Sequence, residues 1–175
     1  DDLPDRTPVH ENLEEIKTAT LRAKDVVRQL LNFSRLSEQN RKPVLLAPII
    51  KEAIKLIRAS VPTTIRIQAD IEDTGSIVKA DPTQIHQVLI NLITNASHAM
   101  EENGGRLDIA LEEITTTMPE ELKFKTLAPG RYLRLSVRDS GIGIEPEILD
   151  RVFDPYFTTK DVDKGTGMGL SVVHG

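Results

Sequence analysis

The chain has 175 residues, a length that corresponds to at most about one domain and a fraction. It contains no cysteine, which excludes disulfide frameworks, thiolate metal sites and cysteine nucleophiles and fits a reducing, cytoplasmic setting. A net charge of −5 argues against a general nucleic-acid binder, and four phenylalanines and two tyrosines are too few for a surface that stacks single-stranded nucleic acid. The longest apolar stretch, residues 44–50, contains a proline, so no membrane span or signal peptide is predicted.

The N-terminal part of the chain divides into segments by composition. Residues 1–10 are polar with two prolines and are expected to form a flexible lead-in. Residues 11–36 lack Gly and Pro and have apolar residues at spacings of three and four, which predicts a helix of about 39 Å. Its wide apolar face indicates a bundle partner, although the helix packing on its own domain is an alternative. We therefore divide the chain into this helix with a polar linker, 11–40, and a main domain, 41–175.

The main domain alternates between strand and helix patterns. Strands are predicted at 44–46, 64–70, 77–80, 107–111 and 133–137, with helices from Ala47 to about Ser60 and from Pro82 to a stop signal at 103–105. A polar segment, 115–130, joins the last two strands. This order predicts an α+β fold, a two-layer sandwich.

Two asparagines on the second helix form the first candidate cluster. Asn91 and Asn95 are four residues apart, so they share one helix face beside strongly apolar positions. An amide oxygen is a hard ligand that suits Mg²⁺ when phosphates supply the remaining oxygens. The alternative is that both amides satisfy backbone groups in the core.

Two glycine-containing segments form the second and third clusters. Asp139-Ser140-Gly141-Ile142-Gly143 follows a strand, where the carboxylate can accept a hydrogen bond from an exocyclic amine and the glycines permit close backbone approach. The alternative is an ordinary strand-exit turn. Gly165-Thr166-Gly167-Met168-Gly169-Leu170 precedes a short apolar run, and glycine-rich backbone before a helix is suited to phosphate. The alternative is a flexible loop.

An aromatic segment lies between these glycine-containing segments. Residues 153–160 read Phe-Asp-Pro-Tyr-Phe-Thr-Thr-Lys and hold three of the six aromatic residues. This pattern is typical of a hinged lid with a hydrophobic anchor, or of a small apolar cluster under a long loop.

Taken in order, these segments resemble the N, G1, F and G2 boxes of the ATP-binding catalytic domain of sensor histidine kinases, members of the GHKL ATPase superfamily. The matching residues are Asn91–Asn95, Asp139–Gly143, Phe153–Phe157 and Gly165–Leu170. The resemblance covers about residues 44–175 and implies a Bergerat-type ATP-binding fold, in which helices cover one face of a mixed sheet. The helix 11–36 resembles the second helix of the family's dimerisation and phosphoacceptor hairpin.

The resemblance implies a role for each matching position. Asn95 would coordinate Mg²⁺, with Asn91 beside it on the metal and phosphate side. Asp139 would bind the adenine amino group, and Gly141 and Gly143 would let the backbone close on the base. In the last box, three glycines would hinge the lid and present backbone amides to the phosphates: Gly165, Gly167 and Gly169. Thr166 and Leu170 belong to the same box.

One position departs from the family pattern. His98, one turn beyond Asn95, stands where many relatives carry a lysine that contacts phosphate. A histidine makes this contact weaker and pH-dependent. We hypothesise that Lys160, between the aromatic segment and the last glycines, supplies the missing positive charge.

The phosphoacceptor histidine is expected to lie outside this chain. His10 is followed by Glu11, as in the family's acceptor motif, but only one helix separates it from the first strand, too few residues for a full hairpin. The nucleotide domain is likewise expected to be truncated after the last glycine-rich box. The fragment by itself would then be inactive as a kinase.

The implied activity is that of a protein-histidine kinase. The γ-phosphate of Mg·ATP would pass to a histidine on the dimerisation helix of a homodimer and then to a receiver-domain aspartate, with no nucleic acid or membrane contact. The alternatives are another GHKL ATPase, a serine-kinase anti-sigma factor, or a non-catalytic nucleotide-sensing dimerisation module. A water-activating glutamate is usual at position 91 in those ATPases, so Asn91 favours phosphotransfer.

The lysine hypothesis predicts that Lys160→Ala weakens ATP binding and slows phosphotransfer, because the phosphates lose a positive charge. Titration with ATP and a phosphotransfer assay measure the two effects. Unchanged values for both would show that Lys160 does not serve this purpose.

Overall fold

The computed structural model describes residues 41–122, 125–159 and 167–174, together with residues 12, 13, 16, 17 and 20. Those five residues are helical, and the Thr20 hydroxyl donates a hydrogen bond to the Ile16 carbonyl at 2.7 Å. The lead-in 1–10 and the rest of the predicted helix lie outside the described residues. The division of the chain at residue 40 stays a prediction.

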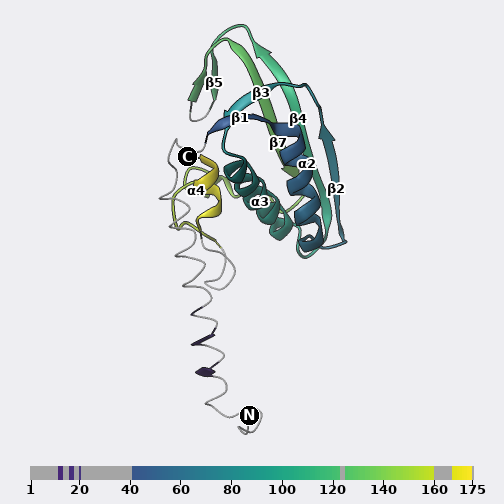
Figure 1. Cartoon of the computed structure of the whole chain (residues 1–175). Helices are drawn as coiled ribbons and strands as arrows, with labels where there is room; N and C mark the ends of the chain where they lie inside the picture. The colour runs from purple at the N-terminus through teal and green to yellow at the C-terminus, as the bar shows by residue number, and fades with distance from the viewer. Residues whose placement is uncertain are drawn as a thin grey trace.

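The described elements alternate as the sequence patterns predict (Figure 1). The helices are α2 (Leu46–Ile57), which continues into a 3₁₀ turn (Arg58–Ser60), α3 (Pro82–Ala99) and α4 (Gly169–His174). The strands are β1 (Lys42–Leu45), β2 (Ile65–Ile71), β3 (Ile77–Ala80), β4 (Gly105–Thr116), β5 (Glu120–Leu122), β6 (Lys125–Leu127) and β7 (Gly130–Asp139).

The main sheet is mixed and has the order β2-β4-β7. β2 runs parallel to β4, from Ile65 opposite Gly105 to Ile71 opposite Leu111, and β7 runs antiparallel to β4. β1 and β3 form a separate antiparallel pair. Helices α2 and α3 cover one face of the main sheet (Figure 1), so the predicted two-layer α+β sandwich is confirmed.

The core lies between the two helices and the sheet. Its fully buried side chains come from α2, α3, the turn after α3, β2 and β4, and they are Ile50, Leu89, Ile93, Met100, Ile65, Leu107 and Ile109. On α3, the buried positions Leu89, Ile93 and Ala96 recur at spacings of four and three, so one face of this helix is held by the core. The opposite face remains available for polar chemistry.

Local signals set both ends of α3. The Asp81 side chain accepts a hydrogen bond from the Thr83 backbone N–H at 2.8 Å, and Pro82 occupies the first helical position. After the helix, Gly104 has a φ of +65° and its N–H donates to the Met100 carbonyl at 2.9 Å. A Cβ at Gly104 would lie 2.7 Å from the Thr64 carbonyl oxygen, so only glycine fits this turn.

The connection between β4 and β7 differs from the prediction of a polar link at 115–130. The two strands extend to Thr116 and from Gly130, and β5 and β6 form an antiparallel hairpin between them. The alternation of apolar and polar residues, which marked the strands, ends where they leave the core. Pairing nevertheless continues there because each strand satisfies the backbone groups of the other.

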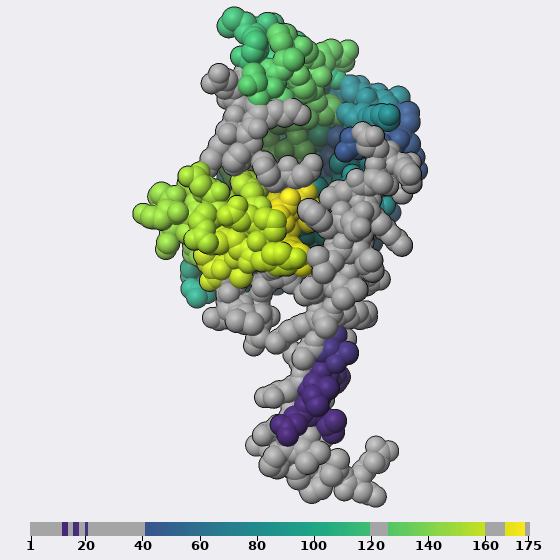
Figure 2. Space-filling model, turned by 90° about the vertical axis from the view of Figure 1, so that its left-hand side faces the viewer, coloured from purple at the N-terminus to yellow at the C-terminus, as the bar shows by residue number. Residues whose placement is uncertain are grey.

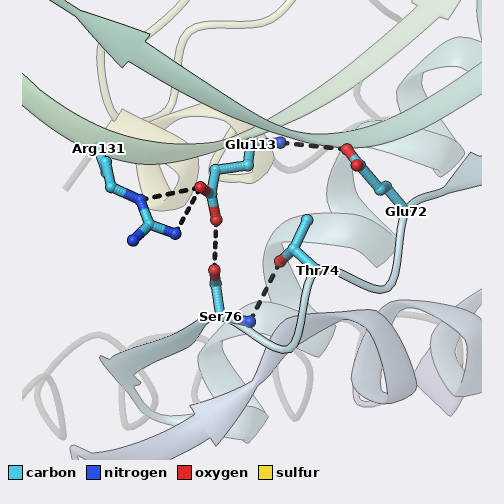
Figure 3. Close-up of polar contacts among 5 residues, drawn as sticks. All are labelled: Glu72, Thr74, Ser76, Glu113 and Arg131. Carbon is cyan, nitrogen blue, oxygen red and sulfur yellow. Dashed lines mark hydrogen bonds and ion pairs between the residues drawn. The ribbon is translucent and has the colours of Figure 1, made fainter.

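A polar network ties the loop between β2 and β3 to this extended pair of strands (Figure 3). The Ser76 hydroxyl donates a hydrogen bond to Glu113 Oε2, and the Arg131 guanidinium donates to Glu113 Oε1 from Nε at 2.9 Å and Nη2 at 2.6 Å. The Glu113 backbone N–H donates to Glu72 Oε2 at 3.4 Å. The Ser76 hydroxyl and then Arg131 lower the pKa of Glu113, because both stabilise its charged form.

The network predicts an acid-sensitive contribution to stability. A carboxyl with a lowered folded-state pKa stabilises the fold fully above its ordinary value of 4.5, and this stabilisation is lost as the pH falls through the folded value. We expect Glu113→Gln to lower the free energy of unfolding in urea at pH 7 and to differ less from the original chain at pH 3.5 and below.

Glu112→Gln is the matched control, since Glu112 also pairs with an arginine, Arg134, across the strands at 3.0 Å but has no serine donor in this network. It should cost less at pH 7. A Glu113→Gln penalty that stays constant from pH 7 to pH 3 would contradict the assignment.

Candidate nucleotide-binding site

Helix α3 carries the two candidate asparagines on the side turned toward α4. Asn91 and Asn95 are half-buried, in contrast to the buried core positions of the same helix. His98, further along α3, is exposed. The prediction that the two amides lie beside a buried flank is therefore met.

The Asn91 carboxamide connects α3 to the start of α4. Its Nδ2 donates a hydrogen bond to the Gly169 carbonyl oxygen at 3.0 Å, and its Oδ1 accepts one from Gln87 Nε2 at 3.0 Å. No hydrogen bond joins the Asn95 side chain to any residue that the structure describes. The two amides, equivalent in the sequence pattern, thus differ in the structure.

The first residue of α4 lies directly against both amides. A Cβ added to Gly169 would lie 3.6 Å from Asn95 Nδ2 and 3.7 Å from Asn91 Cγ, which is ordinary van der Waals contact. Met168, just before it, is buried, and Leu170 is half-buried. The structure therefore brings Gly169 and Leu170 together with the asparagine helix.

The segment after β7 is anchored at the far end of the same helix. The Ile142 backbone N–H donates to the Ala99 carbonyl at 3.1 Å. A Cβ at Gly141 would lie 2.5 Å from that carbonyl oxygen, so the backbone approaches α3 too closely for any side chain. Gly141 N–H also donates to Asp139 Oδ1 at 2.9 Å, a turn that leaves the exposed Asp139 carboxylate its second oxygen.

Ser140 is a positioning residue that the sequence patterns did not identify. Its Oγ accepts a hydrogen bond from the Arg106 N–H at 2.9 Å, and its own N–H donates to the Arg106 carbonyl at 3.1 Å. These bonds hold the end of β7 to the start of β4. The only signal in the sequence is a small hydroxyl residue directly after the strand-end aspartate.

The predicted lid segment is built from successive turns. Between Pro146 and Phe157, backbone N–H groups repeatedly donate to the carbonyl three residues earlier. Phe153 and Phe157 are half-buried, with the Arg151 guanidinium 4.5 Å from the centre of the Phe157 ring, whereas Tyr156 is 61% exposed. The two phenylalanines therefore contribute to packing within this segment, whereas the Tyr156 side chain faces solvent.

The lid segment and the last glycine-rich segment are in contact. A Cβ at Gly167, whose φ is +64°, would lie 2.4 Å from the Tyr156 carbonyl carbon. Figure 2 shows residues 140–159 gathered into one lobe against α4. Gly143 has a φ of +75° and open space around it. Lys160, Gly165 and Thr166 lie outside the described residues.

Both loops are thus anchored on one helix, α3. Their anchoring points, Asn91 and Ala99, are eight residues apart, or about 12 Å along α3. A separate hollow, lined by residues that include Leu45, Thr74 and Leu133, lies at the other end of the sheet and contains none of the candidate site residues.

The described residues contain no group of three or more His, Asp or Glu side chains able to hold a metal ion. A cation at the asparagines would therefore need oxygen ligands from elsewhere, such as phosphates. None of the helices in the described ranges has the length and apolar character needed to span a membrane.

The chain is similar to known proteins over most of its length. Residues 80–175 match the family model described as histidine kinase-, DNA gyrase B-, and HSP90-like ATPase. The sensor kinase CckA of Brucella abortus (strain 2308) is 36% identical over 168 residues, which cover 96% of this chain and 18% of CckA. The chain therefore spans less than a fifth of that relative's length.

Two solved structures of the histidine kinase ThkA extend the comparison. Its catalytic domain without nucleotide has a TM-score of 0.59 and 32% identity, with 77% of each chain covered. ThkA in complex with the response regulator TrrA has a TM-score of 0.61 and 27% identity, and covers 90% of this chain and 42% of ThkA.

The fold and these matches define a domain of the ATPase class. The chain belongs to the histidine kinase-, DNA gyrase B-, and HSP90-like ATPase family, and within that family it is similar to the catalytic domains of sensor histidine kinases.

The close approach at Gly141 predicts a steric effect on stability. Gly141→Ala should destabilise the nucleotide-free chain by about 2–3 kcal/mol in urea unfolding, because its Cβ meets the rigid Ala99 backbone. Gly143→Ala, the matched control, meets no neighbour and should cost only the left-handed backbone penalty of about 1–2 kcal/mol. Equal or reversed losses would mean that the Gly141 contact does not hold the loop.

Proposed function

We propose that the chain binds Mg·ATP between α3 and the two glycine-rich segments and transfers the γ-phosphate to a histidine outside this chain, from which it passes to a receiver-domain aspartate. The observation that carries this proposal is the anchoring of both segments on one helix about 12 Å apart. This separation suits a ligand with a base at one end and phosphates at the other.

At the base end, Asp139 is the acceptor for the adenine amino group. Its Oδ1 already accepts from the Gly141 N–H, which orients the carboxylate and leaves Oδ2 for the ligand. Gly141 lets the loop approach α3, and Gly143, where an added Cβ would meet no neighbour, leaves open space in which the base can lie close to the backbone.

At the phosphate end, Asn95 is the stronger candidate for the Mg²⁺ ligand. Its side chain has no hydrogen bond to the described part of the chain, whereas the Asn91 oxygen already accepts from Gln87. An amide and phosphate oxygens together form a donor set that Mg²⁺ prefers. When bound, the ion would neutralise charge on the phosphates. Asn91 remains a second contact on the same side.

The other proposed nucleotide contacts are assigned from where the residues lie in the chain and on α3. His98 lies on the exposed side of α3 beyond the asparagines. Gly167, Gly169 and Leu170 continue from the lid to α4. Lys160, Gly165 and Thr166 are proposed on the resemblance to the family.

The residue types favour phosphotransfer over hydrolysis. Asn91 carries a neutral amide, which cannot accept a proton from water as a general base does. An imidazole acceptor is itself nucleophilic and needs positioning and charge neutralisation more than activation. This distinction supports a kinase within a family that also contains ATPases.

Two partners belong to the proposal. Leu13 and Ile16 are apolar, helical and more than half exposed, as expected of a helix that packs on a second copy. ThkA, which resembles this chain, has been solved with a response regulator, and we infer a partner of that class here.

The test supplies the chain with radiolabelled ATP, Mg²⁺ and a separate helical hairpin that carries a phosphoacceptor histidine. We expect labelled hairpin, and we expect Asn95→Ala to weaken Mg²⁺-dependent ATP binding by at least about 10-fold. Asn103→Ala, an exposed asparagine in the turn after α3, is the control and should have no effect.

Two results would count against the proposal. Tight ATP binding without transfer would indicate a nucleotide-sensing module in place of a kinase. Binding that is insensitive to Asn95→Ala would remove the metal assignment.

A further inference from the structure

We propose that Gln87 is a positioning residue of the nucleotide site, which orients the Asn91 carboxamide and, through it, the first turn of α4. The effect on nucleotide binding rests on the proposed function. The two hydrogen bonds that run from Gln87 through Asn91 to Gly169, called the relay below, are a property of the chain alone. Gln87 belongs to none of the motifs that point to nucleotide binding.

The polarity of the relay follows from its last member. The Gly169 carbonyl oxygen only accepts hydrogen bonds, so the Asn91 amide must turn its NH₂ toward α4. The Asn91 oxygen then faces the preceding turn of α3, where Gln87 Nε2 donates to it at 3.0 Å. A donor at position 87 therefore selects one of the two orientations of the Asn91 amide.

The orientation of the Asn91 amide affects the position of α4 because of where these residues lie. Gln87 and Asn91 are four residues apart on α3, on adjacent turns of one face, and both are half-buried. The hydrogen bond from Asn91 Nδ2 to the Gly169 carbonyl oxygen, at 3.0 Å, ties the start of α4 to this amide, so it is lost if the amide rotates. With the opposite orientation, two oxygens would face each other across this contact.

The relay also separates the roles of the two asparagines. Asn91 is engaged at both ends of its amide, by Gln87 and by α4, while Asn95 has no hydrogen bond within the described residues. Gln87 therefore orients Asn91 so that it binds the start of α4, the segment that borders the phosphates. Metal coordination is then left to Asn95. In this arrangement, nucleotide affinity depends on a residue that does not touch the nucleotide.

The test uses two substitutions that act on the relay differently. In Gln87→Glu the carboxylate cannot donate, so it attracts the Asn91 NH₂ and reverses the relay. Gln87→Met keeps the length of the side chain and removes the donor. Gln68→Glu adds the same charge on the exposed face of β2 and is the matched control.

Hydrogen exchange without nucleotide measures the relay directly. The Val172 N–H, which donates to the Met168 carbonyl at 3.3 Å in the first turn of α4, should exchange about 10-fold faster in Gln87→Glu and about 2- to 10-fold faster in Gln87→Met. Gln68→Glu should match the original chain. In an Asn91→Ala background, Gln87→Met should add less than about a two-fold change, because it acts through Asn91.

Binding of Mg·AMPPNP to the same full chains measures the consequence for the site, with an expected loss of affinity of about 10-fold in Gln87→Glu. Unchanged exchange in both Gln87 variants, or full effects in the Asn91→Ala background, would overturn the relay. If the original chain binds no AMPPNP, the proposed function fails while the exchange result still decides whether the relay exists.

Discussion

The candidate site depends on one constraint, which is the close approach of two loops to helix α3. Gly141 lies so near the Ala99 carbonyl that no side chain fits, and the Gly169 carbonyl oxygen accepts a hydrogen bond from Asn91 Nδ2 at 3.0 Å. Backbone at these distances is held in register by direct hydrogen bonds, from Ile142 to α3 at one loop and from Asn91 to α4 at the other. A ligand between the loops would therefore meet surfaces whose separation is set by a rigid helix.

The rigidity of α3 comes from burial on its opposite side. Leu89 and Ile93 are fully buried and Ala96 nearly so, and the Asp81 cap fixes where the helix begins. Core packing at this density resists rotation or sliding of the helix, so the polar face keeps its orientation. The Glu113 network lies away from this face, on the extended strand pair, where it holds the β2–β3 loop by charge and hydrogen bonding.

Much of the fold was predictable because its elements carry local patterns. The ends of β3 and the start of α3 agree with the sequence, since alternation and an Asp-Pro cap depend on neighbouring residues alone. The β5–β6 hairpin was missed because its strands lie beyond the core and lack an apolar face to mark them. Ser140 and Gln87 were missed for a related reason: their partners, Arg106 and Asn91, give them a role that residue type alone does not reveal.

By itself, the sequence determined the α+β class, the order of elements and the family, because periodicity and ordered motifs are properties of the chain. It also placed Asn91 and Asn95 on one helix face as equals. Only the tertiary structure decided that Asn91 holds α4 while Asn95 has no partner among the described residues. The reason is physical: a hydrogen bond between residues 78 positions apart depends on how helices pack, and no local pattern encodes that distance.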